Sequence, residues 1–150
     1  MVAMLSKAKA RAAKPPVQRE VLRVKQCMTL APHSIGKDQP LAVAHRLMRQ
    51  HELRHLPVLE RGKLVGILSE RDLYFLESVA GVNPETETVE QGMSNDVYCV
   101  APEATVANVA VEMATHRYGC AVVIEGASVV GVFTTTDALE LLAKCLKAET

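Results

Sequence analysis

Two segments of the sequence share one pattern of residues whose side chains could bind a ligand. Each has a glycine, two apolar residues, a serine or threonine and, three positions later, an aspartate; they are Gly66–Asp72 and Gly131–Asp137. An apolar run typical of a strand precedes each hydroxyl, and a helical pattern follows it. The hydroxyl and carboxylate are therefore expected at a helix N-terminus, where free N–H groups favour anions. A carboxylate suits a ribose diol and a hydroxyl suits phosphate oxygens.

The same spacing is also a helix capping box, which needs no ligand. Two copies at matched positions, each after an apolar strand that begins with glycine, favour binding over capping alone. The two uses are compatible, because a ligand can take the donors that a cap leaves free. In the first copy Arg71 adds a guanidinium that reaches phosphate.

A different signature, H-E-x-x-H, occurs at His51–His55. In zinc hydrolases both histidines face the metal from one continuous helix. Here Pro57 disfavours helix at the residue before it, so we expect His55 to begin a strand. A zinc hydrolase is thus only a remote alternative, and we expect no enzyme, no metal site and no cofactor.

The composition is that of a chain able to bury an ordinary core. Of 150 residues, 49% are apolar and 3% aromatic, and the formal net charge is zero. Residues 1–19 have five basic residues and no acid, which predicts a basic, flexible arm. Without aromatic residues or a wide apolar face, the arm is not expected to bind nucleic acid or a membrane. The longest apolar run in the arm is also too short for a signal peptide, so we expect a cytoplasmic protein.

The cysteines have neither a C-x-x-C pair nor zinc-type spacing, and they are interpreted as small apolar residues. They are Cys27, Cys99, Cys120 and Cys145. A redox role for Cys99 and Cys120, expected on neighbouring strands, remains an alternative.

The sequence contains an internal repeat. Residues 28–72 align without gaps with 93–137 at an offset of 65, and nine of the 45 aligned pairs are identical. Each copy predicts a short strand (33–36, 97–101), a helix and a hairpin (55–60 with 63–69, 120–125 with 129–134). A last helix begins at Glu70 or Thr135. The predicted fold is therefore α/β (α+β), with two βαββα repeats.

These patterns divide the chain into four parts. They are the arm at 1–19, a first repeat at 20–80, a linker at 81–91 and a second repeat at 92–150. A repeat of this size is marginal alone, so the two are expected to pack about a pseudo-two-fold axis that relates two clefts.

Taken together, the repeats resemble a tandem pair of CBS domains, known as a Bateman module. The resemblance covers about residues 24–147. It rests on residues 27–29 and 92–94 at the repeat starts, on the Leu56–Val58 strand and on both aspartate-bearing junctions.

The resemblance implies an adenosine ligand such as AMP, ADP, ATP, S-adenosylmethionine or NAD, with one site supplied by each repeat. Asp72 and Asp137 would hold ribose. The phosphate side would comprise Ser69, Arg71, Thr134 and Thr136. The base would lie against Ser34, Ile35, Arg54, His55, Leu56 and Pro57 in one site, and against Cys99, Val100, Tyr118, Gly119, Cys120 and Ala121 in the other.

The two sites are not expected to bind alike. The second repeat has Val122 where the first has Pro57, and fewer cations: Arg54, His55 and Arg71 are assigned to the first site, and Arg117 to the second. We expect the first to prefer a phosphorylated ligand, and the second to take a less charged one or stay empty.

The leading hypothesis is a sensor in which an adenosine nucleotide shifts the pose of the two repeats and an effector protein reads the change. A homodimer through the apolar face of 139–146 is also expected, unless that face packs on its own sheet. The alternative from another class is a scaffold that binds no ligand.

Overall fold

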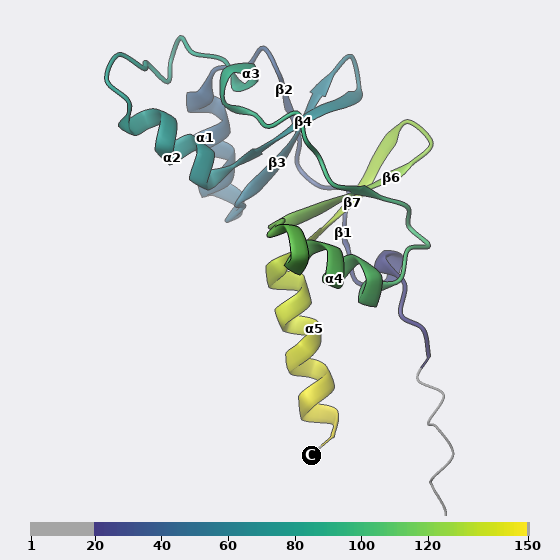
Figure 1. Ribbon diagram of the computed structural model, residues 1–150. Helices are drawn as coiled ribbons and strands as arrows, with labels where there is room; N and C mark the ends of the chain where they lie inside the picture. Colours follow the sequence, from purple (N-terminus) through teal and green to yellow (C-terminus); the bar gives the residue numbers. More distant parts are fainter. Residues whose placement is uncertain (1–19, 150) are drawn as a thin grey trace, which may run out of the picture.

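The computed structural model describes residues 20–149, so the predicted arm at 1–19 lies outside the described residues. The first unit comprises β2 (Ile35–Gly36), α1 (Leu41–His51), β3 (His55–Glu60), β4 (Lys63–Ser69) and α2 (Glu70–Ser78). The second comprises β5 (Cys99–Val100), α4 (Val106–His116), β6 (Cys120–Glu125), β7 (Ser128–Thr134) and α5 (Thr135–Ala148) (Figure 1). The predicted fold of two βαββα repeats is confirmed.

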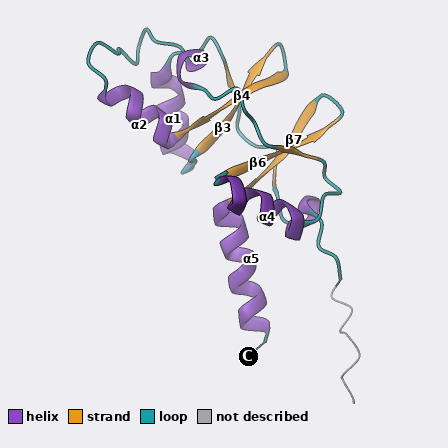
Figure 2. Cartoon of the chain, viewed as in Figure 1, coloured by secondary structure: helices purple, strands orange, loops and turns teal. Residues whose placement is uncertain are grey.

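Each unit is built around an antiparallel hairpin, β3–β4 in one and β6–β7 in the other (Figure 2). The short strand before each helix, β2 or β5, adds in parallel beside β3 or β6. Arg61 and Gly62 form the first hairpin turn with φ of 51° and 77°. Two positive φ angles are typical of a two-residue turn that matches strand twist, and glycine adopts one at little cost.

The segment before each unit crosses to the other unit. The segment before the first unit consists of the 3₁₀ helix Val24–Gln26 and strand β1 (Thr29–Leu30). Strand β1 pairs antiparallel with β7 of the second unit. Before the second unit, α3 (Val89–Gly92) leads to Ser94, which exchanges two backbone hydrogen bonds with Ile67 of β4 at 2.9 and 3.0 Å. The exchange is symmetrical under the 65-residue repeat, and the sequence did not predict it.

Both crossings depend on a glycine in the receiving strand. A Cβ on Gly66 would lie 2.6 Å from Met93 Sδ, and a Cβ on Gly131 would lie 2.5 Å from Met28 Sδ. Because real Cβ atoms do not approach other heavy atoms so closely, these glycines allow the crossing segment to lie flat on the strand.

Each unit has its own core, which the other unit's leading segment completes. The helical spacing of Leu41, Ala44 and Met48, and of Val106, Val109 and Met113, predicts one apolar stripe that faces the sheet in each unit, and all six residues are buried. Val24 is fully buried in the second core, and Val89 is fully buried in the first. The first core consists of Ile35, Leu41, Ala44, Met48, Leu56, Val58, Leu68, Leu73 and Val89. The second consists of Val24, Val106, Val109, Met113, Ala121, Val123 and Phe133.

The last helices of the two units differ. Helix α2 packs back on α1, where His45 Nδ1 lies 2.7 Å from Glu77 Oε1 and the His45 ring meets Tyr74 edge to face. At the equivalent positions, the second unit has Ala110 in place of His45 and Leu142 in place of Glu77, so it lacks this polar link.

Helix α5 instead projects away from the body of the second unit (Figure 1) and leaves an apolar groove of about 470 Å³ beside α4. Its Leu139, Leu142 and Leu146 are 65%, 52% and 57% exposed. The alternative that this face packs on its own sheet is therefore wrong. Among residues 20–149, no helix is both long enough and apolar enough to cross a membrane.

Candidate functional site

Both aspartate-bearing junctions form capping boxes at helix N-termini. At α2, Ser69 Oγ donates to Asp72 Oδ2 at 2.6 Å, and the Asp72 N–H donates to Ser69 Oγ at 3.0 Å. At α5, the Thr134 N–H donates to Asp137 Oδ2 at 2.9 Å, and the Asp137 N–H donates to Thr134 Oγ1 at 3.2 Å. Within the described residues these bonds use only Oδ2 of each aspartate, so capping leaves Oδ1 for another partner.

The first junction opens into a cleft of about 360 Å³, here called the Asp72 cleft. One wall comes from the start of α2. The opposite walls come from the second unit: the crossing segment before β5, and the turn between α4 and β6. The lining residues are His55, Ile67, Ser69, Arg71, Asp72, Ser94, Asp96, Val97, Tyr98, Arg117, Tyr118, Gly119 and Cys120.

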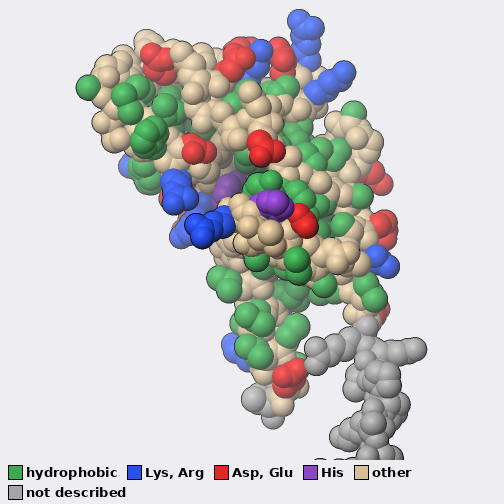
Figure 3. All heavy atoms as spheres, in the orientation of Figure 1, with side chains coloured by type: hydrophobic (Ala, Val, Ile, Leu, Met, Phe, Trp, Pro, Cys, Tyr) green, Lys and Arg blue, Asp and Glu red, His purple; other side chains and the backbone are tan. Residues whose placement is uncertain are grey.

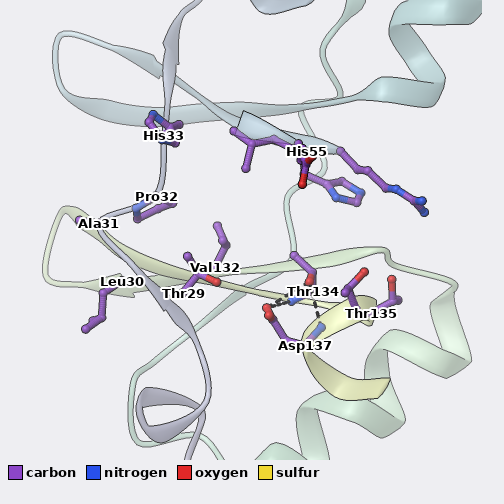
Figure 4. Close-up of a pocket in the computed structure, with 14 residues that line it drawn as sticks. Thr29, Leu30, Ala31, Pro32, His33, His55, Val132, Thr134, Thr135 and Asp137 are labelled. Carbon is purple, nitrogen blue, oxygen red and sulfur yellow. Dashed lines mark hydrogen bonds between the residues drawn. The ribbon is translucent and has the colours of Figure 1, made fainter. Parts of the chain in front are cut away.

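The second junction opens into a cleft of about 340 Å³, the Asp137 cleft (Figure 4). The start of α5 forms one wall, and the crossing segment before β2 and the turn between α1 and β3 form the others. The lining residues are Thr29, Leu30, Ala31, Pro32, His33, Glu52, Leu53, Arg54, His55, Val132, Thr134, Thr135, Thr136 and Asp137.

Each cleft is thus made by both units, in keeping with the two related clefts expected between the repeats. Arg117 lines the Asp72 cleft, whereas Arg54 lines the Asp137 cleft and also a pocket that it shares with Ser69 and Arg71 at the start of α2. The physical reason is the exchange of leading segments, which brings each capped helix N-terminus opposite the helix-to-strand turn of the other unit. The sequence repeat placed these residues correctly within each unit but could not show how the units face each other.

Not every predicted base-contacting side chain lies in a cleft. Arg54, His55, Tyr118, Gly119 and Cys120 line one. The others lie outside the lining of both: Ile35, Leu56, Pro57 and Ala121 are buried, Val100 is partly buried, and Ser34 and Cys99 are exposed.

Sequence reasoning missed the two crossing segments as cleft walls. In the Asp72 cleft the crossing segment contributes Tyr98, whose ring stacks on Tyr118 with centroids 5.2 Å apart. At the position equivalent to Tyr98, the Asp137 cleft has His33, stacked on His51 at 3.8 Å. Once one crossing segment is known to line a cleft, the 65-residue repeat predicts that the equivalent segment lines the other cleft.

Charged side chains distinguish the two clefts. Arg71 and Arg117 line the Asp72 cleft, whereas at the equivalent positions the Asp137 cleft has Thr136 and Glu52. Arg54 is the basic residue that lines the Asp137 cleft. In Figure 3, Lys and Arg side chains gather beside histidine where the upper and lower units meet. The Asp72 cleft is therefore the better provided with groups that bind phosphate.

Burial shifts the pKa of two titratable groups at the junction of the units toward the uncharged form. Burial lowers the pKa of His55, with Arg54 acting in the same direction and the carboxylates of Asp72 and Glu70 opposing it. Burial raises the pKa of Cys120 to about 12, so its thiol stays protonated. Cys99 and Cys120 do lie on neighbouring parallel strands, as expected, and burial also raises the pKa of Cys99.

The H-E-x-x-H segment is not a zinc-hydrolase helix. Helix α1 ends at His51, Glu52 has a left-handed φ of 53°, and His55 begins β3. The two histidines therefore do not share a helix face. In the part of the chain that the structure describes, no three His, Cys, Asp or Glu side chains are placed to hold a metal ion together.

Two βαββα units that exchange their leading segments and enclose two related clefts define a tandem-repeat module. The chain belongs to the CBS-domain family, whose model matches residues 24–77 and 87–144. It is 27% identical over 114 residues to the CBS domain-containing protein YhcV of Bacillus subtilis, covering 76% of this chain and 81% of YhcV. It is 32% identical over 105 residues to inosine-5'-monophosphate dehydrogenase of Korarchaeum cryptofilum, covering 69% of this chain and 21% of that enzyme.

Solved structures show the same fold. A protein from Vibrio cholerae described as an acetoin utilization protein (AcuB) superposes with a TM-score of 0.77 at 29% identity, covering 87% of this chain and 96% of that chain. The CBS domain pair of protein MJ0100, solved with 5'-methylthioadenosine and S-adenosyl-L-methionine, gives 0.74 at 23% identity, covering 83% and 98%.

Proposed function

We propose that this protein is a regulatory module that binds adenosine ligands in the Asp72 and Asp137 clefts and is not an enzyme. The observation that carries the proposal is that both clefts set a capped helix N-terminus, with a carboxylate oxygen left by the cap, opposite a wall of the other unit. Such a site offers an acceptor for a ribose diol and the N–H of Arg71 or Thr136 for an anion, whereas the N–H groups of Glu70 and Thr135 already donate to backbone carbonyl oxygens. The adenosine ligands of MJ0100, a protein of the same fold, support this choice of ligand class.

The composite clefts give the module a way to signal. Because each cleft takes its walls from both units, a ligand contacts both units at once and favours the relative pose in which those contacts fit best. The shift in pose is what an effector protein would read. The proposal places the protein in the cytoplasm, where free nucleotides are found.

The two clefts would select ligands of different charge. Arg71 and Arg117 give the Asp72 cleft two guanidinium groups, which suits AMP, ADP, ATP or NAD. Glu52 in the Asp137 cleft disfavours an extended phosphate chain and suits a less charged ligand such as S-adenosylmethionine.

The test is a thermal-shift and calorimetric panel of these ligands on the full chain. A ligand at a hundred times its Kd stabilises the folded state by about 2.7 kcal/mol, which raises the Tm visibly. Asp72→Ala should abolish the ATP response, and Asp137→Ala should abolish the response to S-adenosylmethionine. Each variant is compared with its own ligand-free Tm, because the substitution also removes half of a capping box. Asp38→Ala, at an exposed position outside both clefts, is the control.

If no adenosine ligand shifts the Tm of the unaltered protein, the ligand-free scaffold becomes the better account. The capping boxes need no ligand, and the exposed apolar face of α5 is by itself a surface for association.

We further propose that a second copy of this chain docks on α5 to form a homodimer. The apolar stripe at Leu139, Leu142 and Leu146 continues into the groove beside α4. Along α5, Glu140 precedes this stripe's centre and Lys144 follows it, so an antiparallel partner helix would set Glu140 of one copy near Lys144 of the other. The α5 faces are therefore complementary to themselves about a two-fold axis.

Leu142→Glu should convert this dimer into monomers, because it places a charge at the centre of the apolar contact. Sedimentation velocity measures the change directly. Val111→Glu is the matched control, since Val111 is 62% exposed but does not line the groove. A chain that sediments as a monomer before any substitution would contradict the dimer.

A further inference from the structure

The ring of His55 lies where the two units meet. His55 begins β3 of the first unit, and its ring lies over Gly119, in the turn before β6 of the second. A Cβ on Gly119 would lie 2.7 Å from His55 Nε2 and 3.0 Å from Cε1. The ring therefore fills the space that any side chain at position 119 would need, and only glycine permits this contact.

The same ring borders both clefts. His55 lines the Asp72 cleft and the Asp137 cleft, and among the residues that the structure describes it is the one shared by the two linings. Figure 4 draws it on the upper strand, on the side of the Asp137 cleft where Thr134 and Thr135 lie. Its repeat equivalent, Cys120, lines only the Asp72 cleft. One imidazole thus separates two clefts that the repeat alone would have made symmetrical.

The environment of the ring favours a neutral imidazole that an added anion would perturb. Burial and Arg54 lower the pKa of His55, whereas the Asp72 and Glu70 carboxylates raise it. A phosphate in either cleft would add negative charge near the ring and favour protonation. The ionisable groups on the surrounding elements are Glu52, Arg54, Glu70, Arg71, Asp72, Asp96, Tyr98, Arg117, Tyr118, Cys120 and Asp137.

We propose that His55 couples the two clefts, so that a ligand in one raises the affinity of the other. The inference rests on the proposed function, because it needs ligands in both clefts. A ligand in either cleft fixes the ring between the units, and the second ligand then meets a junction that is already ordered. Coupling of this kind is reciprocal: each ligand changes the affinity for the other by the same factor.

The first experiment asks whether the ring senses both clefts. AMP is titrated into Asp137→Ala, which keeps the Asp72 cleft, and S-adenosylmethionine into Asp72→Ala, which keeps the Asp137 cleft, while NMR follows the imidazole signals. The His55 signal should move in both variants, and its pKa should rise when AMP is bound in Asp137→Ala. His33 lines only the Asp137 cleft and should respond only in Asp72→Ala. A His55 signal that responds in one variant alone would overturn the inference.

The second experiment measures the coupling. Calorimetry gives the Kd of ATP with and without saturating S-adenosylmethionine. In the unaltered protein S-adenosylmethionine should tighten ATP binding about fivefold or more, the usual lower end of coupling between sites. In His55→Ala that factor should fall below about twofold, whatever the affinity of each ligand measured alone. Cys120→Ala, altered at the equivalent residue, should keep the coupling factor even if its ATP affinity changes.

The outcomes separate this inference from the proposed function. Binding of both ligands without coupling in the unaltered protein, or coupling that survives in His55→Ala, rejects the role of His55 and leaves the proposed function intact. Failure of every adenosine ligand to bind rejects both.

Discussion

The two clefts share a backbone plan but differ at the positions that carry charge. Arg117 of the Asp72 cleft is replaced by Glu52 in the Asp137 cleft, and both residues end a helix in the left-handed conformation, with φ of 58° and 53°. The capping aspartate, in contrast, is present in both. The two units therefore keep the carboxylate for which ribose binding is proposed, while the charged side chains around it differ.

The outer faces of the units diverge in the same manner. The first unit joins its two helices through His45 and Glu77, whereas the second has Ala110 and Leu142 at these positions and an open apolar groove. These two differences between the copies thus accompany a change from a polar link within one unit to an exposed apolar groove in the other.

The largest effect is expected where the two units are most alike, at the crossing glycines. Gly66→Ala sets a Cβ 2.9 Å from the Ser94 carbonyl oxygen, and Gly131→Ala sets one 3.0 Å from that of Thr29. Each should lower the free energy of unfolding by about 1–3 kcal/mol, because the backbone must move apart. Urea denaturation measures the loss. In the control Gly36→Ala the new Cβ meets its nearest neighbour, Gln39 Cγ, at an ordinary 3.6 Å.

Similar losses in the two glycine variants would support the symmetry of the exchange. If one variant were as stable as the control, the two crossing segments would not be equivalent, which would contradict the symmetrical exchange.

A reciprocal charge swap tests the difference between the clefts. Arg117→Glu should weaken ATP binding in the Asp72 cleft about tenfold or more, the size expected for a lost hydrogen bond to a charged group. Glu52→Arg should strengthen ATP binding in the Asp137 cleft. Calorimetry on Asp137→Ala and Asp72→Ala backgrounds reads each cleft separately. Equal ATP affinities in the two clefts before any swap would contradict the asymmetry.

Local elements were predictable from the sequence because their signals are local. The helical spacing of Leu41, Ala44 and Met48 identified the buried face of α1, and the glycine turn at Arg61–Gly62 identified the first hairpin. The capping boxes were evident from spacing alone. The repeated spacing also singled out the two aspartates, and the family resemblance added the expected ligand class.

The arrangement of the two units was not predictable in this way. Nothing in the pattern around Val24 or Val89 shows that each is buried in the core of the other unit, because an apolar residue fits either core equally well. The grouping of Arg54 with Asp137 depends on that exchange, so it could not be inferred from residues within one repeat. The special role of Gly119 depends on a ring from the other unit and was invisible for the same reason.

The smallest expected effect concerns His55 and its equivalent, Cys120. With its pKa raised to about 12, the Cys120 thiol does not titrate in the ordinary range, whereas the pKa of His55 is lowered from its usual 6.5. As pH falls below 6.5 the unfolded chain takes up this proton before the folded protein does, so the free energy of unfolding decreases. Above 6.5 both states are neutral at this residue and the term vanishes. Urea denaturation from pH 7.5 to 5.5 should therefore show a shallower decline in His55→Gln than in the unaltered protein. Cys120→Ala, altered at the equivalent residue, should retain the original slope, because its thiol does not titrate in this range. A His55→Gln curve parallel to it would show that burial does not lower the pKa of this imidazole.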